Sequence, residues 1–275
     1  MPHRYAVIGN PIAHSQSPVI HAAFAEQCGE VIDYGRILGD RHDFAADVQR
    51  FFAQGGLGLN VTLPFKEQAW ALVDERSERA EVAGAVNTLI VLPDGRLRGD
   101  NTDGIGLVRD LADNHGFTFA GARVLLLGAG GAARGVLVPL LGSGLRELVI
   151  ANRTAERAHT LAVLGSGSST VPVAACGFEG LIGERFDLVI NATSAGLSGA
   201  VPPIPADLLA PGGWTYDMLY GAEPTAFCRW GQAHGAARSL DGLGMLVEQA
   251  AESFRLWRGV RPRTAEVIAM LRAAD

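Results

Sequence analysis

The strongest constraint on the fold is a short apolar run that leads directly into a glycine-rich turn. Residues 124–127 read Val-Leu-Leu-Leu, and residues 128–133 follow as Gly-Ala-Gly-Gly-Ala-Ala, the pattern Gly-x-Gly-x-x-Ala. In this pattern the first glycine permits a tight turn, the second lets the backbone approach a diphosphate, and the small final residue keeps the following helix close to the sheet. The free N–H groups at the helix N-terminus suit an anion. The motif predicts a dinucleotide-binding turn between a strand and a helix.

The end of the next predicted strand indicates which dinucleotide is bound. An NAD site normally has Asp or Glu about 20 residues after the glycines, where the carboxylate bonds the ribose 2′-hydroxyl. This chain has Asn152, Arg153 and Thr154 there, with Arg157 one turn further on. Two guanidinium groups and a hydroxyl would attract a 2′-phosphate that a carboxylate would repel. The segment favours NADP(H), although a solvated arginine pair at the start of a helix would give the same residues.

Predicted strands and helices alternate along most of the chain. The expected strands are residues 5–9, 31–38, 57–62, 85–92, 96–99, 123–127, 147–151, 171–174, 187–191 and 213–217. The expected helices are 17–28, 40–54, one whose first turn contains Pro64, 103–115, one after the glycine turn, one from Thr154, and finally 242–257 and 264–273. This alternation predicts an α/β fold with parallel sheets, right-handed crossovers and a ligand site at the carboxyl ends of the strands. We also expect a flexible loop over residues 165–169.

A chain of 275 residues is long for a single core, so two domains are expected. We place a substrate-binding domain at residues 1–102 and a dinucleotide-binding domain at residues 103–238. The last segment, 239–275, is predicted to contain helices without strands. We expect these C-terminal helices to pack back on the first domain.

Composition excludes several classes of function. The net charge is −6 and no block of Lys and Arg occurs, whereas nucleic-acid binding requires clustered positive charge. No apolar stretch of about 18 residues and no secretory leader is visible, so we expect a cytoplasmic protein without a membrane partner. The three cysteines are far apart and the seven histidines form no ligand pair, so no metal site is predicted.

Lys66 is the only lysine in the chain, because every other basic residue is arginine. Arginine stays protonated, whereas a lysine ammonium can release its proton. Since the chain uses arginine at every other such position, Lys66 is a candidate for proton transfer. The alternative is that this one lysine was kept by chance.

Polar side chains gather at the ends of the predicted strands in the first domain. A strand end delivers Asn60, Thr62 and Lys66, and further strand ends add Asn87 and Asp103. Ser15 and Ser17 follow the first strand, although Ser17 before a proline is also typical of a helix N-cap. These hydroxyls, amides and charged groups suit a small polyhydroxylated acid.

Together these motifs resemble the NADP-dependent shikimate dehydrogenases. The motifs that carry the resemblance are residues 9–18, 60–66, 84–88, 101–104, 128–133, 152–154, 191–196, 217–220 and 241–250, in the order of that family. The resemblance implies reversible, NADP-dependent reduction of 3-dehydroshikimate to shikimate, a step of chorismate and aromatic amino-acid biosynthesis. It also implies an N-terminal α/β substrate domain, a Rossmann domain that binds NADP, and a cleft between them.

The same resemblance implies a role for each site residue. Lys66 would be the acid and base, and Asp103 would orient it, although an ionised Asp103 would hold the proton on Lys66 while burial would release it. The substrate residues would be Ser15, Ser17, Thr62, Lys66, Asn87, Asp103, Tyr220 and Gln249, with a contribution from Asn60. The cofactor residues would be Gly128, Ala129, Gly130, Gly131, Ala132, Asn152, Arg153, Thr154, Arg157, Thr193, Met218 and Gly242, with Glu78 as a weaker candidate. We expect a monomer or a homodimer.

Two other functions fit part of the sequence. A quinate/shikimate dehydrogenase would share the fold and accept a wider range of substrates or cofactors. A non-enzymatic NADPH sensor would keep the glycine turn and Arg153, but would have no need for Lys66 and Asp103 beside a hydroxyl-rich pocket.

Overall fold

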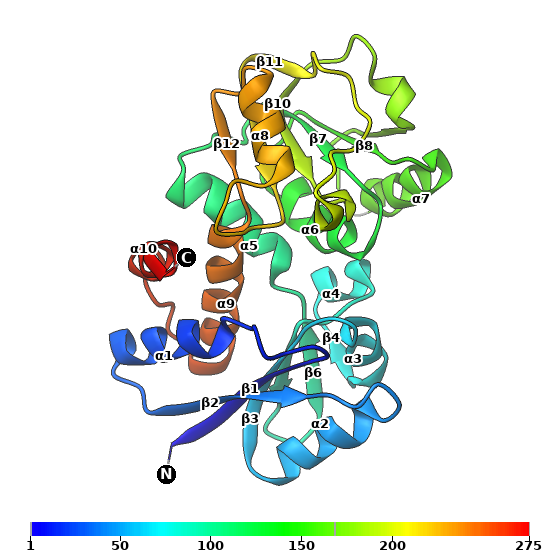
Figure 1. The fold of residues 1–275 in the computed structure, drawn as a ribbon. Helices are drawn as coiled ribbons and strands as arrows, with labels where there is room; N and C mark the ends of the chain where they lie inside the picture. The colour runs from blue at the N-terminus through cyan, green and yellow to red at the C-terminus, as the bar shows by residue number, and fades with distance from the viewer. Residues whose placement is uncertain (1, 168, 275) are drawn as a thin grey trace. The chain divides into compact units, whose positions relative to one another are not determined.

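The chain forms two compact units, drawn as a ribbon in Figure 1. The structure is a computed structural model that describes residues 2–167 and 169–274. Unit 1 comprises Met1–Gly106 and Leu246–Leu271, and unit 2 comprises Leu107–Met245 and Arg272–Asp275. The chain leaves unit 1 inside helix α5 (Asp103–Arg109) and returns inside helix α9 (Leu243–Arg258), whereas we placed the boundaries at residues 102 and 238. Among the described residues, no helix has both the length and the apolar character that a membrane span requires.

Unit 1 is built on a six-stranded sheet with the order β2-β1-β3-β5-β6-β4. Its strands are β1 (His3–Gly9), β2 (Ile32–Leu38), β3 (Gly56–Val61), β4 (Glu75–Arg76), β5 (Thr88–Val91) and β6 (Leu97–Asp100). β1 pairs in parallel with β2 and β3, but β5 is antiparallel to both β3 and β6. The expected parallel pairing therefore holds for β1 with β2 and β3 and for β4 with β6, whereas β5 makes the sheet mixed. The tight turn at Pro93–Gly95 joins β5 and β6 as a hairpin, and so short a connection permits only antiparallel pairing.

Helices cover both faces of this sheet, which explains why β1 is apolar along most of its length. Ala6 and Ile8 of β1 belong to a buried core with Phe44 and Phe65. On the other face, the ring of Tyr5 stacks on that of Trp257, with the centroids 4.9 Å apart. In Figure 1, α2 lies on one side of the sheet and α1 and α9 lie on the other. The helices of this unit are α1 (Ser17–Cys28), α2 (Phe44–Ala53), α3 (Lys66–Leu72), α4 (Glu78–Ala83), part of α5, most of α9, and most of α10 (Ala265–Ala274).

Unit 2 contains a six-stranded parallel sheet with the order β12-β11-β10-β7-β8-β9. Its strands are β7 (Arg123–Leu127), β8 (Glu147–Ala151), β9 (Val173–Cys176), β10 (Phe186–Asn191), β11 (Leu209–Asp217) and β12 (Arg238–Leu240). The strand order is that of the Rossmann fold, in which two βαβαβ halves diverge from the two central strands. The central pair here is β7 and β10, so the carboxyl ends of these two strands form the topological switch point where such folds bind ligands.

Helices and short turns cover the second sheet as well. They are α6 (Gly131–Leu141), α7 (Ala155–Ser166), α8 (Ala226–Ala233), the π-helical turn η1 (Asp110–Asn114) and the 3-10 turns η2 (Phe178–Leu181) and η3 (Ala195–Ser198). Leu125 and Leu127 of β7 share a core with Phe227 of α8. Val124 and Leu126, which alternate with them, are completely buried without joining that core. Side chains on both faces of the strand are thus removed from water.

The helix and strand bounds differ from the predicted ones in several places. α2 begins at Phe44 instead of residue 40, because the Asp43 side chain caps it by accepting a hydrogen bond from the N–H of Ala46. α3 begins at Lys66, after Pro64. α7 continues through Gly165 and Ser166, so the predicted flexible loop over 165–169 is wrong for those two residues; residue 168 lies outside the described residues. The elements β4, β12, α4 and α8 were not predicted.

Candidate active site

Lys66 and Asp103 form the ion pair at the centre of the unit 1 site. The ammonium nitrogen of Lys66 lies 2.6 Å from Oδ2 of Asp103, and both side chains are partly exposed. Asp103 is the first residue of α5, where the helix dipole favours a carboxylate. Lys66 is the first residue of α3, where the dipole disfavours a cation, so the carboxylate of Asp103 offsets an unfavourable placement. A lysine held there against local electrostatics is a candidate functional group.

Asn87 connects this ion pair to helix α9. Its amide nitrogen donates to Oδ1 of Asp103 at 2.8 Å and to Oγ1 of Thr102 at 2.9 Å. The same nitrogen lies 3.3 Å from Oε1 of Gln249, which also accepts from the hydroxyl of Thr102. The amide oxygen of Asn87 accepts from the backbone N–H of Thr102, and this contact fixes which way the amide faces. The structure thus brings Lys66, Asn87, Asp103 and Gln249 into one hydrogen-bonded cluster.

A layer of buried polar side chains lies beneath this cluster, and two of its members, Tyr34 and Ser253, were not predicted. The amide nitrogen of Asn60 donates to the hydroxyls of Thr88 and Ser253, at 3.3 and 3.1 Å. Thr88 and Ser253 are completely buried and lie 2.8 Å apart. Asn60 also accepts from the hydroxyl of Tyr34 at 2.6 Å. Buried hydroxyls are stable only when they are hydrogen-bonded, so this layer fixes the floor of the site.

A buried charged network holds the segment before Asp103 in place. Arg79 donates to both carboxylate oxygens of Asp100, at 2.7 and 3.0 Å, and to Glu252 of α9 at 3.2 Å. Oδ1 of Asp100 in turn accepts from the backbone N–H of Asn101, and Oδ1 of Asn101 accepts from the N–H of Asp103. Arg79 therefore links the segment just before Asp103 to the helix that carries Gln249.

Ser15 and Ser17 lie together in the loop that follows β1. The hydroxyl of Ser15 lies 3.2 Å from that of Ser17 and accepts from the N–H of Ser17. Ser17 does not have the alternative role of an N-cap: Gln16 occupies that position without a side-chain hydrogen bond, and Ser17 begins the helix. Thr62 is near the same loop, because a Cβ on Gly9 would lie 2.5 Å from its methyl carbon.

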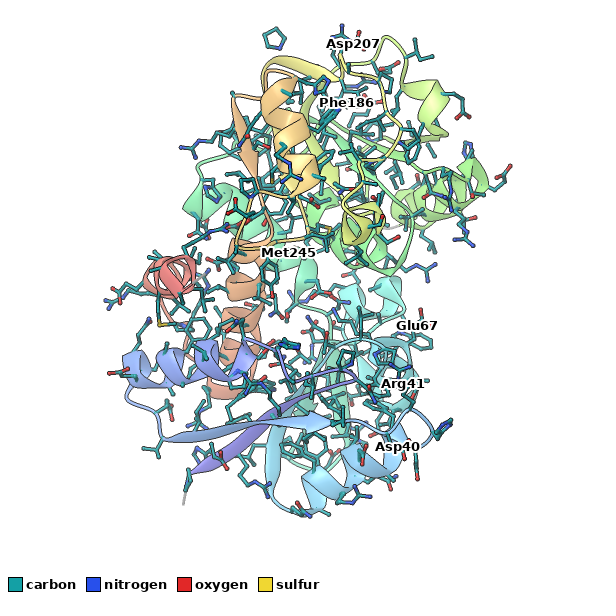
Figure 2. All side chains as sticks on the ribbon, in the orientation of Figure 1. Asp40, Arg41, Glu67, Phe186, Asp207 and Met245 are labelled. Atoms are coloured by element: carbon teal, nitrogen blue, oxygen red, sulfur yellow. The ribbon has the colours of Figure 1, made fainter. Side chains whose placement is uncertain are left out.

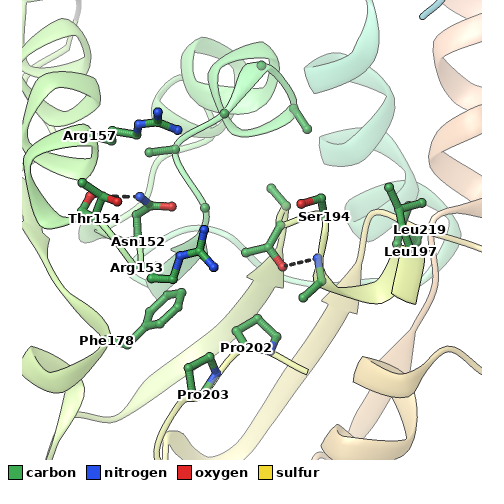
Figure 3. A pocket seen from close by; sticks show the side chains of 18 residues that line it. Asn152, Arg153, Thr154, Arg157, Phe178, Ser194, Leu197, Pro202, Pro203 and Leu219 are labelled. Carbon is green, nitrogen blue, oxygen red and sulfur yellow. Dashed lines mark hydrogen bonds between the residues drawn. The ribbon is translucent and has the colours of Figure 1, made fainter. Parts of the chain in front are cut away.

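Unit 2 contains a cavity of about 510 Å³ at the switch point of its sheet. Figure 3 shows its lining, with Arg153, Arg157 and Phe178 toward one end and Leu197 and Leu219 toward the other. The cavity is lined by every predicted cofactor residue except Met218, Gly242 and the additional candidate Glu78, namely by Gly128, Ala129, Gly130, Gly131, Ala132, Asn152, Arg153, Thr154, Arg157 and Thr193. The unpredicted lining residues are Phe178, Ala192, Ser194, Ala195, Leu197, Pro202, Pro203 and Leu219.

The glycine turn has the shape that a diphosphate requires. Gly128 has φ +107°, and a Cβ there would lie 3.0 Å from the carbonyl oxygen of Ala192, so glycine is needed on two grounds. A Cβ on Gly130 or Gly131 would meet no atom within 4 Å, which leaves the start of α6 open to a ligand. Ala133 is completely buried, as expected where the helix packs close to the sheet.

The two arginines after β8 carry uncompensated charge at the cavity. Among the described residues, neither the Arg153 nor the Arg157 guanidinium has an acidic partner or a side-chain hydrogen bond. Thr154 occupies the N-cap position of α7, but its hydroxyl makes no capping bond. Asn152 bonds the carbonyl of Thr154 at 2.9 Å, which closes the turn. Two free guanidiniums and a free hydroxyl fit the 2′-phosphate of NADP.

The other end of the cavity is formed by the loops after β10 and β11. The hydroxyl and N–H of Thr193 both donate to Oδ1 of Asn191. Asn191 also donates to Asp217, which accepts from the hydroxyl of Thr225 at 2.6 Å. Burial raises the pKa of Asp217, and these hydrogen bonds oppose the shift. Met218 and Gly242 lie against each other, since a Cβ on Gly242 would be within 2.4 Å of the Met218 carbonyl oxygen.

Family models match three segments of the chain. The shikimate dehydrogenase substrate-binding domain matches residues 7–89, the shikimate/quinate 5-dehydrogenase model matches residues 110–198, and the shikimate 5′-dehydrogenase C-terminal domain matches residues 242–272. A curated shikimate dehydrogenase (NADP(+)) from Alkalilimnicola ehrlichii is 61% identical over 272 residues, which cover 99% of each chain. This chain belongs to the shikimate dehydrogenase family.

Solved structures agree with this assignment to the shikimate dehydrogenase family. An Ael1 enzyme from Pseudomonas putida has 48% identity and a TM-score of 0.92, with 98% of each chain covered. Shikimate 5-dehydrogenase from Thermus thermophilus, solved in complex with NADP(H) and shikimate, has 34% identity and a TM-score of 0.86, and 99% of this chain and 100% of that one are covered. The predicted two-domain α/β fold with a Rossmann domain is confirmed.

Two further residues that the family resemblance nominated do not line the unit 2 cavity. Tyr220 is in unit 2, in the loop after β11, and the residue is 42% exposed. Glu78 is the first residue of α4 in unit 1 and is exposed, and it is not among the residues that line the unit 2 cavity.

Proposed function

We propose that this chain catalyses the reversible, NADP-dependent reduction of 3-dehydroshikimate to shikimate. The observation that carries the proposal is the 2.6 Å contact between Lys66 and Asp103 inside a cluster of hydroxyl and amide groups. Membership of the shikimate dehydrogenase family supports the same reaction.

Lys66 is proposed to move the proton. When bound, NADPH supplies a hydride to the carbonyl carbon at C3 of the substrate. The Lys66 ammonium donates a proton to the C3 oxygen as negative charge develops there, and in the reverse direction the neutral amine takes this proton back. Asp103 holds the ammonium in position and accepts a hydrogen bond from a substrate hydroxyl.

The remaining polar groups are proposed to hold the substrate. Ser15 and Ser17 donate to its carboxylate. Thr62, Asn87, Tyr220 and Gln249 bond its hydroxyls, and the Asn87 amide already faces Asp103 and Gln249. Asn60 supports Asn87 through its bond to the Asn87 carbonyl oxygen at 3.2 Å.

The unit 2 cavity is proposed to hold NADP(H). The glycine turn and the start of α6 bind the diphosphate, and Asn152, Arg153, Thr154 and Arg157 bind the adenosine phosphate. Thr193, Met218 and Gly242 lie at the nicotinamide end. The uncompensated guanidiniums of Arg153 and Arg157 are the features that support NADP over NAD.

A quinate/shikimate dehydrogenase is the second candidate, because the family model that matches residues 110–198 is named for both substrates. Quinate differs from shikimate at C1, next to the carboxylate. We also propose a cytoplasmic enzyme that works as a monomer or homodimer, which the acidic composition and the biosynthetic class of the reaction support.

The deciding experiment measures absorbance in the nicotinamide band with shikimate or quinate, each offered with NADP or NAD. Efficient turnover only with shikimate and NADP is the expected result. Comparable turnover of quinate, or a preference for NAD, would favour the broader dehydrogenase. No turnover in any combination, with NADPH still bound, would favour a sensor.

A further inference from the structure

Two arginines bind the loop that carries Ser15. Arg36 on β2 donates from Nη2 and Nε to the carbonyl oxygen of Ser15, at 2.6 and 3.1 Å. Arg41, labelled in Figure 2 beside Asp40, donates to the carbonyl oxygen of Asn10 at 3.2 Å. The two guanidiniums thus hold the two ends of one short loop, and the contact to Ser15 is the closer one.

The charge of Arg36 is not neutralised by any acidic side chain that the structure describes. Other arginines of unit 1 do have carboxylate partners: Arg79 pairs with Asp100, Arg96 with Asp94, and Arg258 with Glu30. A guanidinium stays charged at any physiological pH. Arg36 therefore contributes positive potential at Ser15 under all conditions in which the enzyme works.

The proposed carboxylate site lacks a charge of its own. Ser15 and Ser17 offer two neutral hydroxyls, 3.2 Å apart. Moving a carboxylate from water to neutral donors costs free energy unless a positive charge lies nearby. Arg36 is exposed, but its guanidinium contacts the backbone of Ser15 and so lies well within the Debye length of about 8 Å at physiological salt, where salt screens its field only in part.

We propose that Arg36 is the positioning and specificity-determining residue for the carboxylate of the substrate. It fixes Ser15 through two hydrogen bonds to one carbonyl, and it supplies the positive charge that lets two serine hydroxyls select an anion. This inference rests on the proposed function, which assigns the carboxylate to Ser15 and Ser17.

The first test compares Arg36→Gln and Arg36→Lys with the wild type. Arg36→Gln is expected to raise the KM for shikimate by about tenfold. The Kd for shikimate, from calorimetric titration of the ligand-free protein, should rise by the same factor. The kcat and the KM for NADP should stay nearly unchanged. Arg36→Lys keeps the charge but not the paired hydrogen bonds, and is expected to show a smaller rise. Arg98→Gln is the matched control, because it removes an exposed arginine charge from β6 of the same unit.

The second test uses the methyl ester of shikimate, which has the same ring but no negative charge. The wild type is expected to discriminate strongly against the ester, and Arg36→Gln is expected to discriminate about tenfold less, because only the acid loses an electrostatic partner. An unchanged KM for shikimate in Arg36→Gln would overturn the proposal. An equal rise in KM for the acid and the ester would also overturn it, because it would show that Arg36 merely supports the loop that carries Ser15. A wild type that turns over neither compound would instead refute the proposed function.

Discussion

At the scale of single residues, the site depends on a lysine that the local helix disfavours. The ammonium of Lys66 lies at the positive end of α3 and is held by one oxygen of Asp103, while Asn87 donates to the other oxygen. This arrangement leaves Lys66 with protons that can point away from Asp103. Lys66 could be nominated from the sequence, because it is the only lysine and follows a predicted strand. Ser253 was not predictable, because nothing in the local sequence of α9 places a serine beside Thr88, 165 residues away.

Lys66→Ala is expected to lower kcat by about two to four orders of magnitude, the range that general acid–base groups contribute. Lys66→Arg is expected to be almost as slow, because arginine keeps the charge but does not release its proton. Steady-state assays measure kcat, and calorimetric titration with shikimate should show a Kd within about tenfold of the wild type. Near-normal turnover in Lys66→Arg would show that charge alone is needed and would remove Lys66 as the proton donor.

At the scale of elements, the cavity proposed to hold the cofactor is made by loops at the ends of parallel strands. The turn after β7 offers backbone groups, the turn after β8 offers Arg153 and Arg157, and the loop after β10 offers Thr193. Strand β7 and the glycine turn were predicted with their observed bounds, because apolar strands buried on both faces have a clear signal. The hydrophobic wall formed by Phe178, Pro202 and Pro203 was missed, since it comes from irregular segments whose position depends on tertiary packing. Strand β12, three residues long, is too short for its periodicity to be read.

Arg153→Ala is expected to raise the KM for NADP by about 10- to 100-fold, which is the effect of losing one hydrogen bond to a charged group. The KM for NAD should change little. The reason is that only NADP has the 2′-phosphate. Initial rates with each cofactor at saturating shikimate provide the measurement, and Arg146→Ala serves as a control for the loss of an exposed arginine in unit 2. Equal losses for both cofactors would contradict the phosphate assignment.

At the scale of the whole molecule, unit 1 carries a feature that links its stability to pH. His21 is completely buried and stacks on Tyr34 with the centroids 4.2 Å apart, and the residues that the structure describes offer neither ring nitrogen a hydrogen bond of normal geometry. Burial lowers the pKa of His21 from 6.5 to about 3. At about pH 5 the His21 side chain is therefore protonated in the unfolded chain but neutral in the folded chain. As a result, the free energy of unfolding falls as the pH drops below 6.5.

His21→Phe is expected to reduce this acid sensitivity. Between about pH 7.5 and pH 5.5, protonation of His21 in the unfolded state should lower the free energy of unfolding by about 1.4 kcal/mol. Phenylalanine fits the aromatic neighbours Phe24, Phe254 and Trp257 and cannot take up a proton. Urea titrations at both pH values would show the difference, with His159→Gln as the control for an exposed histidine. The same pH dependence in His21→Phe and wild type would show that another group is responsible.

The division of the chain also bears on the order in which the site can be assembled during synthesis. Unit 2 is almost entirely one continuous stretch, Leu107–Met245, whereas unit 1 needs Leu246–Leu271 in addition to Met1–Gly106. Before α9 leaves the ribosome, Asn60, Thr88 and Asn87 lack Ser253 and Gln249, their partners on that helix. The glycine turn, Arg153 and Arg157 are therefore translated before the hydrogen-bonded layer of unit 1 can be completed. A nascent chain has all the strands of unit 2 first, and the contacts of Asn60 and Asn87 to α9 form only after that helix has been made.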